Sequence, residues 1–391
     1  MPAINQKSIL TGVLFFITSV AFAQHEIFFK IKSNDKKHLA DTIYVAGTFN
    51  GWVENKTPLS FSKSDSTWQL HLQNLKDDLY EFKFTRGSWG KVESKDNGFD
   101  VANHTIALTS DTVFQYNILG WKDDFPPRER KHTVSKNVSM LDSAFFMPEL
   151  NRKRRIWIYL PDGYASSTRR YPVMYMHDGQ NLFDEYVSGY GEWGVDECLD
   201  SLQQQTKNAC IVVGIDNGPK RLNEYNPYDN ERFGPGEGKA YTAFLVNQLK
   251  PFIDKHYRTL TSPQNTIIAG SSMGGVISYY AVLEYPNVFG KAGIFSPAFW
   301  VSPQMLMLTD TLGKKLTGKY FFYMGGLEGE QYMQDMKNVT EKLGQVSDAL
   351  IYSQTDSEGK HSEVAWRKWF PQFYKWIMSD WTNYVIKEED D

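Results

Sequence analysis

A glycine-framed serine directly after a short apolar run strongly limits what this part of the chain can fold into. Ser272 lies in Gly270-Ser271-Ser272-Met273-Gly274, which follows Thr266-Ile267-Ile268-Ala269. The apolar run is typical of a buried strand, and residues 276–283 are suited to a helix. Glycine allows the backbone to reverse tightly without a Cβ clash. The segment therefore predicts a strand, a sharp turn and a helix, with Ser272 at the carboxyl end of a parallel sheet and acting as a nucleophile.

A serine hydroxyl in such a turn needs a base that removes its proton. In α/β-hydrolase folds the base follows the serine in the chain, and of the eight histidines only His361 does so. His361 lies in a polar loop with Gly359, before an aromatic-rich segment that we expect to be helical. We predict His361 as the base; the alternative is an ordinary solvated loop histidine.

A carboxylate is expected to orient the imidazole of such a base. Residues 319–324 should form a strand, and Glu328 lies in the loop that follows it. Glu328 is therefore the predicted acid, with Glu330 and Asp335 as alternatives. Each of the three could instead be a solvated surface charge.

Two backbone N–H groups are needed to bind a developing oxyanion. One should belong to Met273, the residue after the serine. The other should belong to Gly179 or Gln180, in the loop after the predicted strand 171–176. The alternative is that this loop is a plain strand-to-loop turn.

The two halves of the chain differ in the spacing of their apolar residues. Residues 24–122 contain short alternating segments separated by turn formers, which predicts a small immunoglobulin-like β-sandwich. Residues 123–134 are charged, contain Pro126-Pro127 and are predicted to be a linker. Residues 135–385 alternate continuous apolar strands with helical patterns, which predicts a catalytic domain with a mostly parallel sheet and flanking helices.

Residues 1–23 have the features of an export signal. Lys7 supplies a positive start, residues 9–22 are largely apolar, and Ala21-Phe22-Ala23 fits a cleavage site. A membrane anchor is the less favoured alternative, because a spanning helix needs roughly 20 apolar residues. We expect an exported protein, periplasmic or extracellular, with no membrane span.

Charge and cysteine content argue against several partners and cofactors. The formal net charge is −4 and the basic clusters are short, so we do not expect nucleic acid as a partner. Cys198 and Cys210 could form a disulfide or remain buried thiols, and their spacing is not that of zinc ligands. We expect no cofactor and no metal site. Neither charge nor cysteine content predicts an oligomeric state.

The second half resembles the esterase D and enterochelin esterase group, which includes carbohydrate esterase family 1. The resemblance covers about residues 135–380. It implies an α/β-hydrolase that cleaves esters with Ser272 and His361 as nucleophile and base. The acid in such enzymes is often Asp, so Glu328 departs from the pattern. The motifs that carry the resemblance are Ile158-Tyr159-Leu160-Pro161, Tyr171-Pro172-Val173-Met174-Tyr175-Met176-His177-Asp178-Gly179, Gly270-Ser271-Ser272-Met273-Gly274-Gly275, Ser296-Pro297 with Trp300, and Gly359-Lys360-His361.

The first half resembles early-set modules that bind glycogen and starch. In such modules exposed indoles stack on sugar faces, which here implies Trp52 and Trp89, with Lys83 and Asn103 hydrogen-bonding to hydroxyls. A module that only braces the catalytic domain is the alternative. The segments that carry this resemblance are Val45-Ala46-Gly47-Thr48-Phe49-Asn50-Gly51-Trp52 and Tyr80-Glu81-Phe82-Lys83-Phe84-Thr85-Arg86-Gly87-Ser88-Trp89.

Aromatic residues in loops of the second half could line a cleft or belong to the core. Trp193 and Trp300 are candidate substrate contacts. Arg221, paired with Glu224, could shape the same cleft, or both could be ordinary surface charges. The favoured substrates are feruloyl or acetyl esters on polysaccharide. A siderophore esterase, an acyltransferase, and a carbohydrate-binding protein with an inactive hydrolase half are the alternatives.

Overall fold

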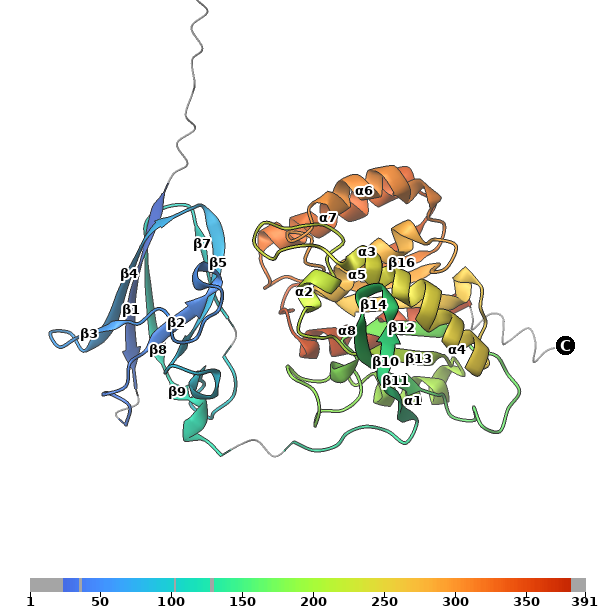
Figure 1. Cartoon of the computed structure of the whole chain (residues 1–391), viewed down its shortest axis with the longest axis horizontal. Coiled ribbons are helices and arrows are strands. Elements are labelled where there is room, and N and C mark those ends of the chain that lie inside the picture. The colour runs from blue at the N-terminus through green and yellow to red at the C-terminus, as the bar shows by residue number, and fades with distance from the viewer. Residues whose placement is uncertain (1–23, 35–36, 102, 127–129, 381–391) are drawn as a thin grey trace, which may run out of the picture. The chain divides into compact units, whose positions relative to one another are not determined.

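A computed structural model of the chain describes residues 24–34, 37–101, 103–126 and 130–380. The predicted export signal lies outside these residues. The chain divides into two compact units, residues 1–129 and 130–391, and the division falls within the segment predicted to be a linker (Figure 1). In the part that the structure describes, no helix has the length and apolar character needed to cross a membrane.

The described residues of the first unit form strands and short 3-10 turns. One sheet has the order β3-β4-β1-β8 and a second has the order β2-β5-β7, while β6 pairs with β9. Phe29, Phe82 and Phe84 contribute to one buried cluster of this unit. All nine strands lie within residues 24–122, where short strands were predicted, and the immunoglobulin-like class stays a prediction. The strand bounds are β1 (His25–Ser33), β2 (Tyr44–Gly47), β3 (Ser60–Ser62), β4 (Thr67–Leu75), β5 (Asp78–Thr85), β6 (Glu93–Ser94), β7 (His104–Leu108), β8 (Thr112–Ile118) and β9 (Gly120–Trp121).

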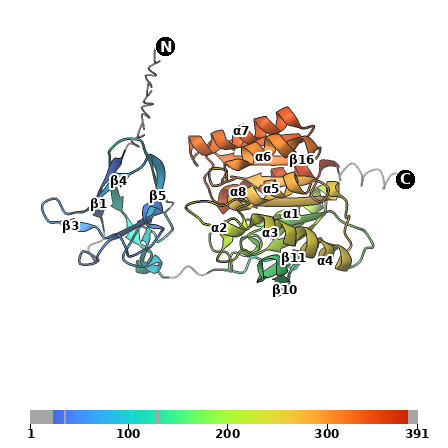
Figure 2. The ribbon, with the colours of Figure 1, turned by 45° about the horizontal axis from the view of Figure 1, so that its top comes forward.

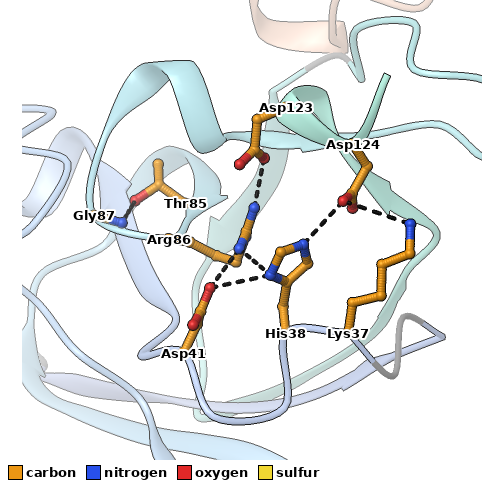
Figure 3. Close-up of polar contacts among 8 residues, drawn as sticks. All are labelled: Lys37, His38, Asp41, Thr85, Arg86, Gly87, Asp123 and Asp124. Atoms are coloured by element: carbon orange, nitrogen blue, oxygen red, sulfur yellow. Dashed lines mark hydrogen bonds and ion pairs between the residues drawn. The ribbon is translucent and has the colours of Figure 1, made fainter. Parts of the chain in front are cut away.

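A buried arginine connects three segments of the first unit (Figure 3). Arg86, directly after β5, donates to the carboxylates of Asp41 and Asp123 and to Nδ1 of His38. Because Nδ1 accepts, Nε2 carries the ring proton and donates to Oδ1 of Asp124 at 3.0 Å. The network fixes the chain where the predicted linker begins onto the body of the first unit.

An eight-stranded sheet forms the centre of the second unit. Its order is β10-β11-β13-β12-β14-β15-β16-β17. The six strands from β12 to β17 are mutually parallel, while β10 and β11 are antiparallel to their neighbours. The strand bounds are β10 (Val138–Met147), β11 (Arg152–Tyr159), β12 (Val173–His177), β13 (Ile211–Ile215), β14 (Thr266–Ser271), β15 (Lys291–Phe295), β16 (Lys319–Gly325) and β17 (Leu350–Asp356).

Helices cover both faces of this sheet (Figures 1 and 2). Val173 and Tyr175 of β12 pack in the cluster with α3 to α7, whereas Met174 and Met176 pack in the cluster with α1 and α8. Because both faces are buried, the strands are continuously apolar, which confirms the predicted architecture. The helix bounds are α1 (Val195–Thr206), α2 (Arg221–Glu224), α3 (Gly238–Phe244), α4 (Lys250–His256), α5 (Met273–Glu284), α6 (Gln304–Leu312), α7 (Glu330–Val346) and α8 (Glu363–Ile377).

The two cysteines are free thiols in the structure. Cys198 lies on α1, and Cys210 directly precedes β13. Both belong to the core on the α1 and α8 face of the sheet. Burial raises the pKa of each thiol to about 12, which keeps both protonated and unreactive near neutral pH.

Candidate active site

The strand, turn and helix predicted around Ser272 are present. β14 ends directly before Ser272 and α5 begins directly after it. Ser272 has φ 58° and ψ −122°, a strained conformation for a residue with a side chain. Its N–H donates to the carbonyl of Phe295 at 2.9 Å, which fixes the turn against β15. A Cβ on Gly270 would lie 2.9 Å from the backbone of Gly274, so the turn requires glycine there.

A buried glutamate holds the imidazole of His361. Oε2 of Glu328 lies 2.6 Å from Nδ1 of His361. The Glu328 side chain is 2% exposed, while that of His361 is 47% exposed. Since Nδ1–H donates to the carboxylate, Nε2 of the neutral ring is left as the proton acceptor. This is the arrangement that a general base requires.

Of the three candidate carboxylates, Glu328 is the one found in contact with His361 in the described part of the chain. Glu330 is the first residue of α7. Asp335 lies five residues further along that helix, where its Oδ1 accepts a hydrogen bond from Gln331 at 2.8 Å. The geometry therefore favours the carboxylate that the sequence ranked first.

The second oxygen of Glu328 is also bound. Oε1 accepts from Oγ of Ser296 at 2.6 Å and from the N–H of Gly325 at 2.8 Å. The indole N–H of Trp366 donates to the same Ser296 oxygen at 2.9 Å. Sequence reasoning gave Ser296 and Trp366 no role in the site. The signal available in the sequence was that Ser296-Pro297 is one of the motifs that carry the family resemblance.

The three residues are carried by parallel strands with a common direction. Ser272 follows β14, Glu328 follows β16 and His361 follows β17, and β15 lies between β14 and β16. The carboxyl ends of parallel strands meet at one edge of a sheet, which is where ligands bind in such folds. The end of β15 links the Ser272 turn to Glu328, because the carbonyl of Phe295 accepts the Ser272 N–H and the hydroxyl of Ser296 donates to Glu328.

The loop after β12 is linked to the Ser272 turn, called the elbow below, by an ion pair that the sequence did not reveal. Asp178 is buried and has φ 57°. Its carboxylate accepts from Nε and Nη2 of Arg221 at 2.7 and 2.8 Å, and from Nδ2 of Asn217 at 2.7 Å. Arg221 Nη2 also lies 3.4 Å from the carbonyl of Ser271. Burial opposes ionisation of Asp178, but Arg221 outweighs it and lowers the pKa of that carboxyl.

Gly179 is required by packing against a strand. A Cβ there would lie 2.8 Å from the backbone of Gly214 and Ile215 on β13. Gln180 accepts the N–H of Asn217 through Oε1 at 3.1 Å. The loop is thus held rigidly at the sheet edge. Met273 begins α5, and N–H groups of a first helical turn have no partner within the helix. The oxyanion role of Met273, Gly179 and Gln180 stays a prediction.

The suggested pairing of Arg221 with Glu224 is wrong. Arg221 binds Asp178, whereas Glu224 is buried and binds Arg154 and Nη1 of Arg152, the latter at 2.6 Å. The guanidinium of Arg221 is therefore engaged within the protein. This position favours support of the loop over the predicted contact with substrate.

The two predicted aromatic contacts of the second unit differ in exposure. Trp193 is 3% exposed, and its ring lies 5.0 Å from that of Phe295 and 5.6 Å from that of Trp366. This burial favours a packing role over the predicted substrate contact. Trp300 is 41% exposed, and its ring centroid lies 6.1 Å from that of Phe233. Of the pair, Trp300 is the one that offers surface to a substrate.

In the first unit, Trp52 and Trp89 lie next to each other, with ring centroids 6.2 Å apart. Trp89 is exposed, and Trp52 has φ 61° directly after Gly51. Lys83 donates through Nζ to the carbonyl of Val101 at 2.5 Å, and burial lowers its pKa. The indole pair is therefore the part of the predicted sugar site that remains available, and sugar binding stays a prediction.

A buried carboxyl near the site was missed by sequence reasoning. Glu363 is the first residue of α8, and its Oε1 accepts from Nδ2 of Asn181 at 3.3 Å. Burial raises the pKa of Glu363 to about 7, and the charge of Asp178 adds to the effect. Its position two residues after His361 was the one signal in the sequence.

Residues 147–377 match the family model "Esterase", described as "Putative esterase". The uncharacterized protein YbbA of Bacillus subtilis (strain 168) is 30% identical over 204 residues, which are 50% of this chain and 78% of that protein. The endo-1,4-beta-xylanase/feruloyl esterase of Xylanibacter ruminicola is 24% identical over 245 residues, 61% of this chain and 31% of that protein. The iron(III) enterobactin esterase of Escherichia coli (strain K12) is 23% identical over 225 residues, 56% of this chain and 52% of that protein. The match thus spans less than two thirds of either named esterase.

Solved structures share the fold. The enterobactin esterase FES of Shigella flexneri aligns with a TM-score of 0.53 at 14% identity, over 91% of this chain and 93% of that chain. The BES protein of Bacillus cereus aligns with a TM-score of 0.53 at 18% identity, over 65% of this chain and 99% of that chain. At these identities the likeness shows an α/β-hydrolase-type fold.

Proposed function

Since the chain belongs to this esterase family, we propose that it hydrolyses carboxylic esters with Ser272 as the nucleophile. The contact of buried Glu328 with Nδ1 of His361, at the sheet edge that carries the strained Ser272 turn, is the observation that carries this proposal. It prepares Nε2 of a partly exposed imidazole to accept a proton.

The reaction proceeds in two halves through an acyl-enzyme. Nε2 of His361 takes the Ser272 proton while Oγ attacks the ester carbonyl, and Glu328 stabilises the imidazolium that forms. The N–H groups of Met273 and of Gly179 or Gln180 bind the oxyanion. His361 then protonates the departing alkoxide. Water, deprotonated by His361, attacks the acyl group in the second half and releases the acid and the Ser272 hydroxyl.

Turnover of p-nitrophenyl acetate tests this assignment. Ser272→Ala should lose at least about 10³-fold in kcat/KM, because the attacking oxygen is removed. Ser271→Ala is the matched control, since it removes the neighbouring hydroxyl at the end of β14 and should retain most activity. Equal rates for the wild type and Ser272→Ala would end the proposal.

Feruloyl or acetyl esters on polysaccharide are the proposed substrates. The feruloyl esterase relative, the exposed Trp300 and the Trp52–Trp89 pair support this choice. An aromatic acyl group packs well on an exposed indole. Methyl ferulate and acetylated xylan should therefore be cleaved, and failure with both would exclude this substrate class.

A siderophore ester is the second candidate. The likeness to enterobactin esterase FES extends over 91% of this chain, so it includes much of the first unit. Ferric enterobactin assayed beside methyl ferulate and acetylated xylan separates the two candidates by kcat/KM. A preference for ferric enterobactin would replace the polysaccharide proposal without affecting the assignment of Ser272.

A carbohydrate-binding protein without catalysis is the candidate from another class. The full chain carrying Ser272→Ala, run through starch or xylan affinity gels, measures binding apart from hydrolysis. Retardation that is lost in Trp89→Ala would assign sugar binding to the indole pair. Binding together with no esterase activity in the wild type would favour this class.

We propose further that residues 1–23 direct export and are removed after Ala23. The N-terminal sequence of the protein recovered from a cell envelope or culture fraction should then begin at Gln24. Recovery of protein that begins at Met1 and stays in the cytoplasmic fraction would contradict export.

A further inference from the structure

Three carboxylates meet at the start of α1, outside the proposed site around Ser272. Glu192, Asp196 and Glu197 each offer an oxygen, and these oxygens lie within 4.8 Å of one another. Asp196 is 0% exposed and Glu192 is buried, while Glu197 is partly exposed. We call these three residues the Glu192 cluster.

Three of the six carboxylate oxygens have hydrogen-bond donors. Oε1 of Glu192 accepts from the Thr133 hydroxyl at 2.7 Å, and Oε2 accepts from Nη1 of Arg367 at 3.1 Å. Oδ2 of Asp196 accepts from the N–H of Ser135 at 2.7 Å. These contacts fix the Glu192 and Asp196 carboxylates in place.

Two of the other oxygens are buried without a donor. The third of these oxygens, Oε1 of Glu197, has an ion-pair contact of 3.8 Å with Nη2 of Arg367. Oδ1 of Asp196 and Oε2 of Glu197 are inaccessible to solvent and have no hydrogen-bond partner within the described part of the chain. Buried polar atoms are almost always satisfied, so these two oxygens on adjacent residues need a partner, either a proton that the two carboxyls share or a bound cation.

The charges of the Glu192 cluster are also unbalanced. Three carboxylates face the guanidinium of Arg367, which leaves −3 + 1 = −2 when all are ionised. Burial raises the pKa of Asp196 to about 8, so without an ion this carboxyl keeps its proton near neutral pH. The N-terminus of α1 favours negative charge, and this explains why acids occur in its first turn. It does not supply a donor to the two buried oxygens. A deficit of two charges fits a divalent cation.

The ligand chemistry points to one class of ion. A site made only of carboxylate oxygens suits hard cations such as Ca²⁺ and Mg²⁺. Oxygens that share one Ca²⁺ at about 2.3–2.6 Å can lie up to about 5 Å apart, which matches the observed separation. We infer that the Glu192 cluster binds a divalent cation and that Ca²⁺ fits it best.

Such an ion would join segments that are distant in the chain. Thr133 and Ser135 belong to the start of the second unit, the cluster lies at the start of α1, and Arg367 belongs to α8. An ion bound only by the folded protein stabilises it by mass action. We therefore expect the ion to raise thermal stability, whether or not the chain is an esterase.

Thermal unfolding of the full chain after chelation tests the inference. Titration with CaCl₂ at constant ionic strength should raise Tm by several degrees in a saturable manner, and calorimetry should give one site per chain. Tb³⁺ should bind in place of Ca²⁺ and luminesce when the adjacent Trp193 is excited. Asp196→Asn and Glu197→Gln should each abolish the rise in Tm and the luminescence.

Glu341→Gln, which changes an exposed acid on α7, is the matched control and should keep both signals. The inference is overturned if the wild type binds neither Ca²⁺ nor Mg²⁺ at millimolar concentration. It is also overturned if both cluster variants still respond to the ion. A higher Tm of Asp196→Asn than of the wild type, with no effect of any ion, would show that Asp196 and Glu197 share a proton.

Discussion

The carboxylate of Glu328 binds a partner through each of its oxygens. Oε2 holds His361, and Oε1 is held by Ser296 and by the N–H of Gly325. These donors hold the carboxylate in a fixed orientation in a buried position. At this position a glutamate can therefore perform the role that the family resemblance assigns more often to aspartate.

Glu328→Gln should lower kcat for p-nitrophenyl acetate by about 10³- to 10⁴-fold, because the amide cannot stabilise the imidazolium and favours the wrong tautomer. Glu330→Gln, which changes the neighbouring acid at the start of α7, should retain activity. A normal rate for Glu328→Gln would remove Glu328 from the mechanism and reopen the choice of acid.

Glu363 makes the stability of the protein depend on pH. Because burial raises its pKa from 4.5 to about 7, the folded protein holds this proton more tightly than the unfolded chain. The free energy of unfolding therefore falls as pH rises through this range. Glu363→Gln should match the wild type near pH 4 and exceed its stability at pH 8 by up to about 3 kcal/mol.

Denaturant unfolding at the two pH values measures this difference, with the exposed Glu358→Gln as control. A difference between Glu363→Gln and the wild type that stays constant with pH would contradict the assignment.

Among the elements, the loop after β12 and the elbow after β14 are held together by the Asp178–Arg221 pair. The fork of Arg221 binds both oxygens of Asp178 and reaches the carbonyl of Ser271. If the loop supplies an oxyanion donor, its placement relative to Ser272 depends on this planar fork. Lysine keeps the charge but cannot reproduce two parallel hydrogen bonds.

Arg221→Lys should therefore lower kcat by about 10- to 100-fold with little change in KM, because misplacement of a donor acts mainly on the transition state. Arg155→Lys, which alters a comparable pair with Asp216, should change neither constant. A rise in KM alone would instead assign Arg221 to substrate binding, as the sequence first suggested.

Elements could be predicted from the sequence better than contacts between them. Periodicity located the strands and the elbow, because burial on both faces of a sheet leaves a continuous apolar pattern. The partner of Arg221 could not be located, because Asp178 lies 43 residues away and only the sheet order brings the two together. The same limit explains why Trp193 was predicted as a substrate contact. The residues that bury it come from β15 and α8, which are distant in the sequence.

For the whole molecule, each unit has a hydrophobic core of its own. Phe82 lies at the centre of the first core and Phe322 within the second, and both are fully buried. No spacing in the sequence predicts the Glu192 cluster, which forms where polar contacts bring residues 133–135, the start of α1 and α8 together. These segments are distant in the sequence and meet only in the folded protein.

Phe82→Ala should destabilise the first unit by about 3–5 kcal/mol, because it leaves a cavity in that core. Calorimetry should show one transition shifted downward, with kcat/KM for p-nitrophenyl acetate unchanged. Phe322→Ala should shift the other transition and reduce activity. Loss of activity in Phe82→Ala under conditions where the second transition is intact would contradict independent cores.

Trapping of the acyl-enzyme tests the central claim most directly. Wild-type protein mixed with p-nitrophenyl acetate and quenched in acid should carry one acetyl group, and peptide mapping should place it on Ser272. Ser272→Ala should carry none, and Ser271→Ala should be labelled as the wild type is. An acetyl group on another residue, or turnover that continues unchanged in Ser272→Ala, would contradict the account.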